Sequence, residues 1–170
     1  MKILNIHERK FECRAEQLGA LLDSLASAED LLWPHETWPR MSFDGSLAMG
    51  AQGGHGPIRY DVEHYEPGRA IRFRFTNPRG FQGHHGYEVK EIESGAMLRQ
   101  VLEMNSLGSA LLSWPLIFRP LHDALIEDSL TKAEFVLGFK PDYRLWSPWV
   151  IFLRFLLGGK RAKSQRQLLP

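Results

Sequence analysis

One amphipathic segment dominates the sequence: residues 109–138, which read SALLSWPLIFRPLHDALIEDSLTKAEFVLG. With a rotation of about 100° per residue, one helical face of this segment is apolar and the opposite face is polar. The apolar face carries Phe118, Leu121, Leu125, Ile126, Ala133, Val136 and Leu137, and the polar face carries Asp123, Glu127, Thr131 and Glu134. The pattern predicts a long helix with one buried side.

The expected ends of this helix are marked by proline and glycine. Pro120 suits a first-turn position, where its missing N–H is not needed, and Gly138 suits the left-handed residue just past the last turn. A helix between them has about 18 residues and a length of about 27 Å. In a second interpretation an earlier helical turn begins at Pro115, with Ser113 as its cap, and Pro120 is a kink.

The composition indicates one globular domain that has no electrostatic preference for nucleic acid. The chain has 170 residues, which suits one domain with a single core. A formal net charge of +1 gives no electrostatic reason to expect nucleic acid. The single cysteine, Cys13, excludes an internal disulfide and suits a reducing compartment. Because the N-terminus alternates from Ile3 onward and shows no charged start with an apolar block, we expect no secretory signal and a cytoplasmic protein.

The residues before the long helix predict one strand, two short helices and five further strands. Residues 4–12 predict the first strand, and the leucines that follow have helical spacing at Leu18, Leu21, Leu22 and Leu25. Ser27 and Asp30 form a capping-box-like start for a second short helix, which Pro34 ends. From residue 43 to residue 104 apolar and polar side chains alternate between short turns, which indicates five consecutive antiparallel strands.

An antiparallel sheet with one apolar face must have that face covered. The only late element long enough to cover it is the helix that ends at Gly138, so we expect the sheet to curl around this helix. The glycine-rich stretch 50–56 lacks the lysine and spacing of a phosphate loop and predicts a flexible hairpin. The predicted fold class is α+β: a curved antiparallel sheet wrapped around a long C-terminal helix, with two short helices after the first strand.

This order of elements resembles the helix-grip fold of the START-like superfamily, also called the SRPBCC proteins. Four short strings resemble those of a bacterial branch: Trp38-Pro39, GGHGPIRY at 53–60, Pro67-Gly68-Arg69 and RPLHDAL at 119–125. The resemblance covers nearly all of residues 1–138, the expected domain, and leaves residues 139–170 as an apolar and basic tail. It implies a cavity between sheet and helix. It implies no particular ligand, because polyketide cyclases, lipid-transfer START domains and plant pathogenesis-related class 10 proteins share that cavity and differ in its contents.

Polar side chains on the predicted apolar faces mark a candidate ligand pocket. They are Tyr60, His85, Tyr87 and Gln100 from the sheet, with His122 and Ser129 from the helix. Any one of them is expected to be satisfied by the backbone or a neighbour. Six together are costly to satisfy individually, and small-molecule sites are mostly apolar with a few placed polar groups. With Phe73, Phe75 and Leu125 as apolar lining, these residues are the predicted ligand-binding set.

The predicted function is binding of a small apolar or aromatic ligand that is lipid-like or polyketide-like. The alternative is a cyclase-like or dehydratase-like enzyme, which the resemblance permits. In that enzyme His85 or His122 is the catalytic candidate, acting as general acid or base with Tyr60 or Gln100 as a hydrogen-bond partner. Binding is favoured because the sequence shows no inward carboxylate to pair with either histidine.

The pattern of histidines and the lone cysteine predicts neither a metal site nor a cofactor. His84 and His85 are adjacent on a strand, so they point to opposite faces and cannot both bind one ion. The sequence has no His-Glu-x-x-His or Cys-x-x-Cys spacing.

The tail presents a burial problem. Its apolar residues include Trp146, Trp149, Phe152 and Leu153, and they are followed by Lys160, Arg161, Lys163 and Arg166. The apolar run 149–157 is too short for a membrane span, which needs about 20 residues. In the favoured interpretation residues 148–157 fold back as a short helix onto the domain or onto a second copy in a homodimer. In the other, the tail anchors a membrane-associated lipid-handling protein through its tryptophans and basic residues.

Overall fold

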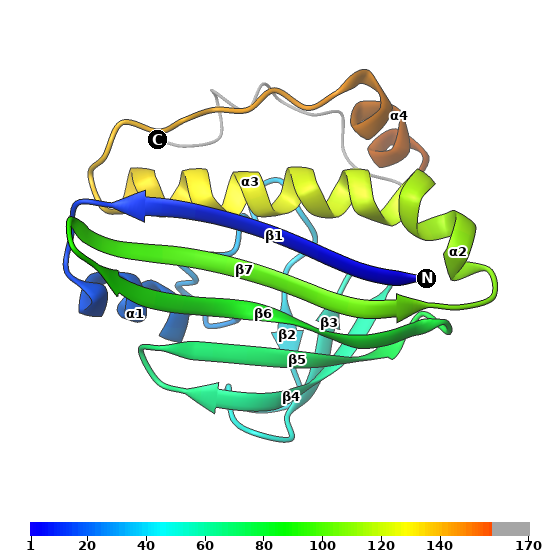
Figure 1. Ribbon diagram of the computed structural model, residues 1–170, viewed down its shortest axis with the longest axis horizontal. Helices are drawn as coiled ribbons and strands as arrows, with labels where there is room; N and C mark the ends of the chain where they lie inside the picture. The colour runs from blue at the N-terminus through cyan, green and yellow to red at the C-terminus, as the bar shows by residue number, and fades with distance from the viewer. Residues whose placement is uncertain (158–170) are drawn as a thin grey trace.

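The computed structural model describes residues 1–157 as an α+β fold in which one long helix lies along one curved sheet (Figure 1). The elements in chain order are β1 (Lys2–Phe11), α1 (Ala15–Asp23), β2 (Ser42–Phe43), β3 (Gln52–His55), β4 (Ile58–Glu66), β5 (Ala70–Asn77), β6 (Phe81–Ile92), β7 (Gly95–Ser106), α2 (Ala110–Ser113), the π-helical turn η1 (Trp114–Phe118), α3 (Arg119–Val136) and α4 (Pro148–Leu156).

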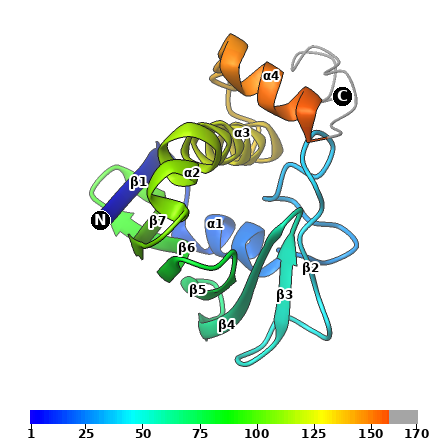
Figure 2. The ribbon, with the colours of Figure 1, turned by 90° about the vertical axis from the view of Figure 1, so that its right-hand side faces the viewer.

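All strands belong to one antiparallel sheet in the order β1-β7-β6-β5-β4-β3-β2. The first strand pairs with the last, from Lys2 opposite Asn105 to Phe11 opposite Ala96. Seen end-on, the sheet bends from β1 around to β2 and β3, with α3 inside the curve (Figure 2). The predicted fold class is therefore confirmed, and α3 covers the apolar face of the sheet.

Two local expectations between β1 and β4 need correction. Only the first of the two short helices is present, as α1. The second is replaced by turns, because the Asp30 carboxylate accepts hydrogen bonds from the backbone N–H groups of Ala26, Leu32 and Trp33 at 2.8, 3.0 and 2.7 Å. The five strands expected from residue 43 onward are six, because β2 ends at Phe43 and the glycine-rich stretch contributes β3, which forms a hairpin with β4. A Cβ on Gly54 would lie 2.0 Å from the Ile58 carbonyl oxygen, so only glycine allows this approach.

The long helix begins earlier than Pro120, as in the second interpretation, but it starts at Ala110 and Ser113 is not its cap. α2, η1 and α3 follow one another without a break, and the N–H of Arg119 donates to the carbonyl of Trp114, five residues back. Because Pro120 has no N–H, the Leu116 carbonyl lacks its usual helical partner. The indole N–H of Trp149 in α4 donates to this carbonyl at 2.7 Å instead.

The C-terminal end of the helix is as predicted. Gly138 has φ +79°, and the N–H groups of Gly138 and Phe139 donate to the carbonyls of Phe135 and Glu134 at 3.1 and 2.9 Å. This is the Schellman arrangement, which needs a left-handed residue directly after the helix. It turns the chain back along α3 toward α4 (Figure 1).

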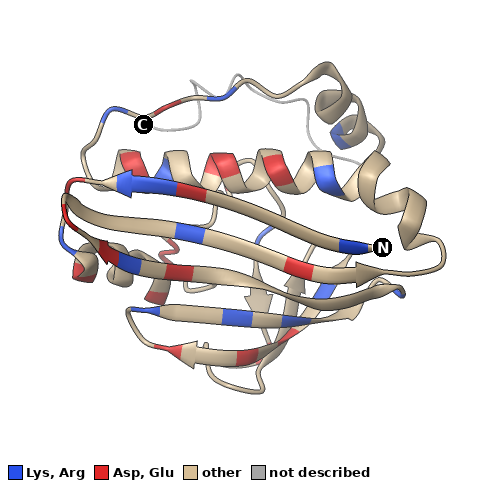
Figure 3. Ribbon diagram, viewed as in Figure 1, with Lys and Arg blue, Asp and Glu red and all other residues tan. Residues whose placement is uncertain are grey.

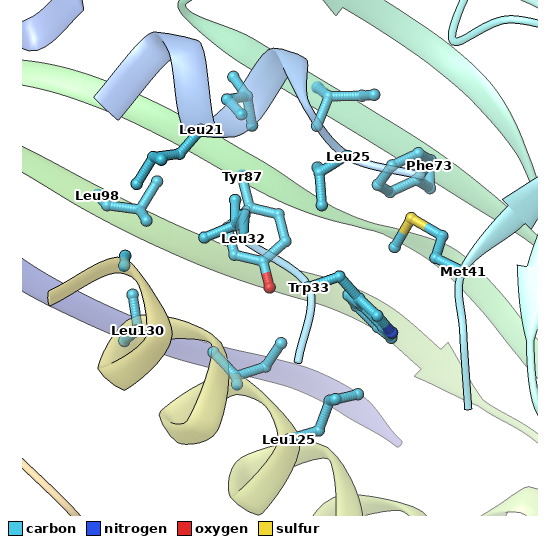
Figure 4. Packing of buried hydrophobic residues seen from close by; sticks show 14 of the residues in the cluster. Leu21, Leu25, Leu32, Trp33, Met41, Phe73, Tyr87, Leu98, Leu125 and Leu130 are labelled. Atoms are coloured by element: carbon cyan, nitrogen blue, oxygen red, sulfur yellow. The ribbon is translucent and has the colours of Figure 1, made fainter. Parts of the chain in front are cut away.

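The main core lies between α1, the sheet, the loop 24–41 and the inner face of α3 (Figure 4). Phe73, Leu102 and Leu125 are buried as expected, and Phe75 and Val89 are partly buried. α4 packs on this body through Val150 and Leu153. No helix within residues 1–157 has both the length and the apolar character that crossing a membrane requires.

Candidate functional site

A cavity of about 1010 Å³ lies between α3, the sheet and the loop that follows α1. Cavities of this size hold drug-sized or lipid-sized molecules. Its walls are mainly aromatic and aliphatic, with a few polar groups. The residues that form them include Trp33, Trp38, Phe75, Phe81, His85, Tyr87, Leu102, Trp114, Phe118, Leu121, His122, Leu125, Ile126, Trp146, Arg154 and Leu157.

Strand register places a ladder of rings on the sheet side of the cavity. His85 of β6 stands opposite Phe73 of β5, and it stacks on Phe75 with ring centroids 4.7 Å apart. Tyr60 of β4 meets the His85 ring edge-on at 4.9 Å. Because alternate residues of a strand share a face, the alternating pattern of β4, β5 and β6 brings all four rings together. Phe75 and His85 form the part of this ladder that lines the cavity, and Tyr60 and Phe73 pack behind them.

His85 is the polar group in this wall that has no partner. Its side chain is 5% exposed, and its Nε2 has no hydrogen-bond partner among the described residues. Burial, and then the nearby His55 and His122, hold the pKa of His85 well below its usual value. The ring is therefore neutral at physiological pH, and an unsatisfied buried nitrogen costs about 1–3 kcal/mol. Within the described residues, this nitrogen is left with the capacity for one hydrogen bond.

His122 lies on the helix side of the cavity and is backed by Gln100. The Nε2 atoms of the two side chains are 3.3 Å apart, and Gln100 is fully buried behind the ring. Burial lowers the pKa of His122, while the neighbouring Asp123 carboxylate opposes that shift. His122 Nδ1 lies 3.7 Å from Asp123 Oδ1, outside hydrogen-bonding distance.

A hydrogen-bonded chain crosses the interior from sheet to helix to loop. The Tyr87 hydroxyl donates to Ser129 Oγ at 3.0 Å, and the Ser129 hydroxyl donates to the Leu32 carbonyl at 3.0 Å. Both hydroxyl groups are buried and satisfied, so Ser129 holds the loop in place and is not open to a ligand.

The predicted binding set is therefore divided between the cavity wall and the layer behind it. Phe75, His85, Tyr87, His122 and Leu125 line the cavity. Tyr60, Phe73, Gln100 and Ser129 lie fully buried behind that wall. Tyr60 orients another histidine, because its hydroxyl lies 3.0 Å from His55 Nδ1. Burial lowers the pKa of His55 to about 3, so this ring is also neutral.

We call the side of the cavity where the lining residues Glu36, Pro39 and Leu157 are exposed its mouth. Three residues that the sequence analysis did not assign to the cavity, Trp38, Trp146 and Arg154, meet there. The guanidinium of Arg154 lies 4.2 Å from the ring centroids of both Trp38 and Trp146. The two indole N–H groups donate to Asp128 Oδ2 at 2.7 and 3.0 Å. These residues come from α3, α4 and two irregular segments. The Trp-Pro corner at Trp38 was the only local signal, since irregular segments have no periodicity to read.

The loop that carries Trp33 and Trp38 is attached to α3 by a buried lysine. Lys132 Nζ donates to the carbonyls of Asp30 and Trp33 at 2.9 and 2.8 Å and to Glu36 Oε1 at 2.8 Å. A buried ammonium needs this full set of acceptors. The cavity wall made by the loop is therefore held by α3 itself.

A second polar cluster lies outside the cavity, where β1 meets α3 (Figure 3). His7 Nδ1 lies 2.7 Å from Glu127 Oε1, and Arg9 donates to Glu127 and Glu134 at 2.8 and 2.9 Å. Burial alone would lower the pKa of His7, but hydrogen bonds to Asp123 and Glu127 outweigh it and raise the pKa to about 9. β1 thus covers Glu127 and Glu134 on the polar face of α3, and Asp123 stays partly exposed.

The curved antiparallel sheet around the long helix α3 is a helix-grip fold, with a cavity between sheet and helix. A protein from Thermobifida fusca aligns with a TM-score of 0.60 at 10% identity over 84% of this chain and 97% of its own. Norcoclaurine synthase from Thalictrum flavum, solved with dopamine and hydroxybenzaldehyde, aligns with 0.59 at 13% identity over 84% and 90%. CalU16 from Micromonospora echinospora aligns with 0.56 at 12% identity over 92% and 83%. At these identities the likeness shows the fold. No protein-family model and no curated protein sequence matches the chain.

Proposed function

We propose that this protein binds a small apolar or aromatic ligand, lipid-like or polyketide-like, in the cavity between α3 and the sheet. The observation that carries the proposal is the combination of a cavity of about 1010 Å³ with aromatic walls and a neutral histidine, His85, whose Nε2 has no partner in the described residues. A packed core of this size would be filled by its own side chains. The apolar walls favour a hydrocarbon or aromatic body, and His85 favours one hydroxyl or carbonyl group.

The lining favours binding over acid–base catalysis. Its one carboxylate within the described residues, Glu36, lies at the mouth and is held by Lys132 at 2.8 Å. His85 has no carboxylate to orient it or to raise its pKa toward the range in which a general base is most effective. A cyclase-like or dehydratase-like activity would depend on His122, which has Asp123 beside it at 3.7 Å.

Two measurements test the binding proposal. Native mass spectrometry of the full chain, followed by extraction and analysis of the released molecule, identifies what co-purifies. Displacement of the fluorescent probe anilinonaphthalene sulfonate by fatty acids, by flat polycyclic aromatics and by sugars then ranks ligand classes. We expect fatty acids or aromatics to compete and sugars not to. Saturable probe binding that none of the apolar competitors displaces would contradict the proposal.

A second candidate function, delivery or collection of the ligand at a membrane, is favoured by one feature of α4. Arg154 and Leu157, at the end of this segment, line the cavity, while an opposite apolar face is exposed to solvent. The exposed residues are Trp149, Ile151, Phe152, Phe155 and Leu156. The expected anchor set needs correction, since Leu153 is buried in the core and Trp146 is held by Asp128 and Arg154. Lys160, Arg161, Lys163 and Arg166 lie outside the described residues.

Liposome flotation tests the membrane function. We compare the full chain, a chain that ends at Asp142 and the double variant Phe152→Ser/Phe155→Ser, with Leu4→Ser on β1 as a control for loss of an exposed apolar side chain. We expect the full chain and the control to float with anionic vesicles at low salt. The chain that ends at Asp142 and the double variant should remain at the bottom of the gradient. If α4 instead joins two copies, light scattering shows a dimer that the double variant abolishes, and no form floats.

A further inference from the structure

Three side chains at the contact between β1 and α3 are placed as metal ligands. His7, His122 and Asp123 each offer one ligand atom, and these atoms lie within 4.8 Å of one another. His7 Nε2 lies 3.2 Å and His122 Nδ1 lies 3.7 Å from the same oxygen, Asp123 Oδ1. Zinc bonds to nitrogen and oxygen of about 2.0–2.2 Å in a tetrahedron place ligand atoms roughly 3.3–3.6 Å apart. The two distances to Asp123 Oδ1 are close to this range, so the three side chains can bind one zinc ion.

Two unsatisfied atoms beside this group point to a missing partner. His122 Nδ1 and Asn5 Oδ1 are both buried, and neither has a hydrogen-bond partner among the described residues. Asn5 is tied to the same carboxylate, because its Nδ2 donates to Asp123 Oδ1 at 2.8 Å. Leaving each buried atom unpaired costs about 1–3 kcal/mol. A hydrated cation satisfies both, with Nδ1 as its ligand and the Asn5 oxygen as acceptor for a metal-bound water.

His7 has a carboxylate hydrogen-bonded to its second ring nitrogen, as metal-binding histidines usually do. Its Nδ1 donates to Glu127 Oε1 at 2.7 Å, which leaves Nε2 directed toward the other ligands. Glu127 is itself held by Arg9 at 2.8 Å and by Arg144 at 3.2 Å. A carboxylate on the second ring nitrogen fixes the tautomer and orientation of a ligand histidine.

Gln100 provides the equivalent partner for His122. Its Oε1 is buried without a partner, and its Nε2 lies 3.3 Å from His122 Nε2. The nitrogen and oxygen of an amide are interchanged by a 180° rotation of the group. In the rotated position the oxygen accepts a hydrogen bond from His122 Nε2–H. That hydrogen bond satisfies Gln100 and leaves the lone pair of His122 Nδ1 for a metal.

We propose that His7, His122 and Asp123 bind a divalent transition-metal ion, with Zn²⁺ the best fit. Two imidazoles and one carboxylate suit zinc and exclude a site for magnesium or calcium, which prefer oxygen ligands. The ion takes the place of the proton on His7 Nε2, and water completes four-coordination. Asp123 is partly exposed, and His122 also lines the cavity, so the ion lies between solvent and the ligand cavity.

Metal titration of the full chain tests this proposal. The protein is stripped with EDTA and titrated with ZnCl₂ in a calorimeter and with CoCl₂ in a visible spectrometer. We expect one equivalent of Zn²⁺ to bind with micromolar or tighter affinity, and Co²⁺ to give the intense visible bands of a four-coordinate site. His7→Gln and Asp123→Asn weaken zinc binding at least 100-fold, and Glu127→Gln weakens it about 10–100-fold as an outer partner.

Controls separate this site from adventitious binding and from unfolding. His64→Gln removes an exposed histidine on β4 and keeps wild-type affinity. Circular dichroism checks that each variant is folded, and the wild-type titration does not depend on the variants. Absence of a stoichiometric zinc complex in the wild-type chain overturns the proposal, and so does equal affinity in folded His7→Gln. Either result would show that His7, His122 and Asp123 interact only with one another and bind no metal.

Discussion

The guanidinium of Arg154 lies 4.2 Å from the ring centroid of Trp38, so a residue of α4 closes on a residue of the loop after α1. Arg154 also donates to the Thr37 carbonyl, and Trp146 packs on its other side at 4.2 Å. All of these residues line the cavity. The contact therefore joins the two segments that form the mouth.

Arg154→Met is expected to loosen this mouth. A cation over an aromatic ring contributes about 0.5–2 kcal/mol, so the loss raises the opening rate of α4 more than it changes the fold. We expect hydrogen exchange in α4 and loop 33–39 to accelerate and the association rate of anilinonaphthalene sulfonate to rise several-fold. Arg79→Met, at an exposed turn, is the matched control. Unchanged exchange in both segments would show that the mouth does not depend on Arg154.

Leu125→Trp is expected to block the cavity. Leu125 is buried on the inner face of α3 and lines the cavity, so a larger side chain at this position enters the space that a ligand needs. We expect probe affinity to fall at least 10-fold, with a stability cost of about 1–3 kcal/mol from overpacking. Leu112→Trp makes the same change at an exposed position of α2 and should bind normally. An equal loss of probe affinity in both variants would show that the probe does not bind in the cavity.

Stability should depend on pH through His7 in the zinc-free protein. Its folded-state pKa of about 9 lies above the unfolded value of 6.5. Its contribution is therefore complete below pH 6.5 and is lost as pH rises through 9. In EDTA, we expect the free-energy difference between wild type and His7→Gln to shrink by about 1–3 kcal/mol between pH 6.5 and 9.5. Chemical denaturation at each pH measures it. If the free energy of unfolding changes with pH in the same way in both proteins, His7 is not the source of the pH dependence.

The Tyr87–Ser129 hydrogen bond should be worth more to stability than to binding. Ser129→Ala leaves the Tyr87 hydroxyl and the Leu32 carbonyl without their partner, a cost of about 1–3 kcal/mol. In the double variant with Tyr87→Phe the two losses should not add, because they remove one shared contact. Denaturation of the four proteins in this cycle measures the coupling. Ligand affinity that falls in Ser129→Ala without loss of stability would instead make Ser129 a direct ligand contact.

Local patterns were sufficient for most of the fold. Alternation between residues 58 and 104 predicts β4 to β7, because a half-buried strand requires period two regardless of its partners. The helical apolar stripe predicts α3, and Gly138 predicts its end, since only the residue after the last turn must be left-handed. Of the two polar residues in that stripe, His122 lies on the cavity wall and Ser129 is buried behind it.

Strand β1 shows what periodicity does not decide. Its aliphatic residues Leu4 and Ile6 are exposed, while Asn5, His7 and Arg9 face α3. The alternation is clear in the sequence, but which face turns inward depends on the three carboxylates that α3 presents there, more than 110 residues later. The same holds for Trp38, Trp146 and Arg154, which meet only because α3 turns the chain back over the loop. Helix and strand formation follow from neighbours in the chain, whereas the charges and rings of the site pair across space, and only the packed tertiary structure selects those pairs.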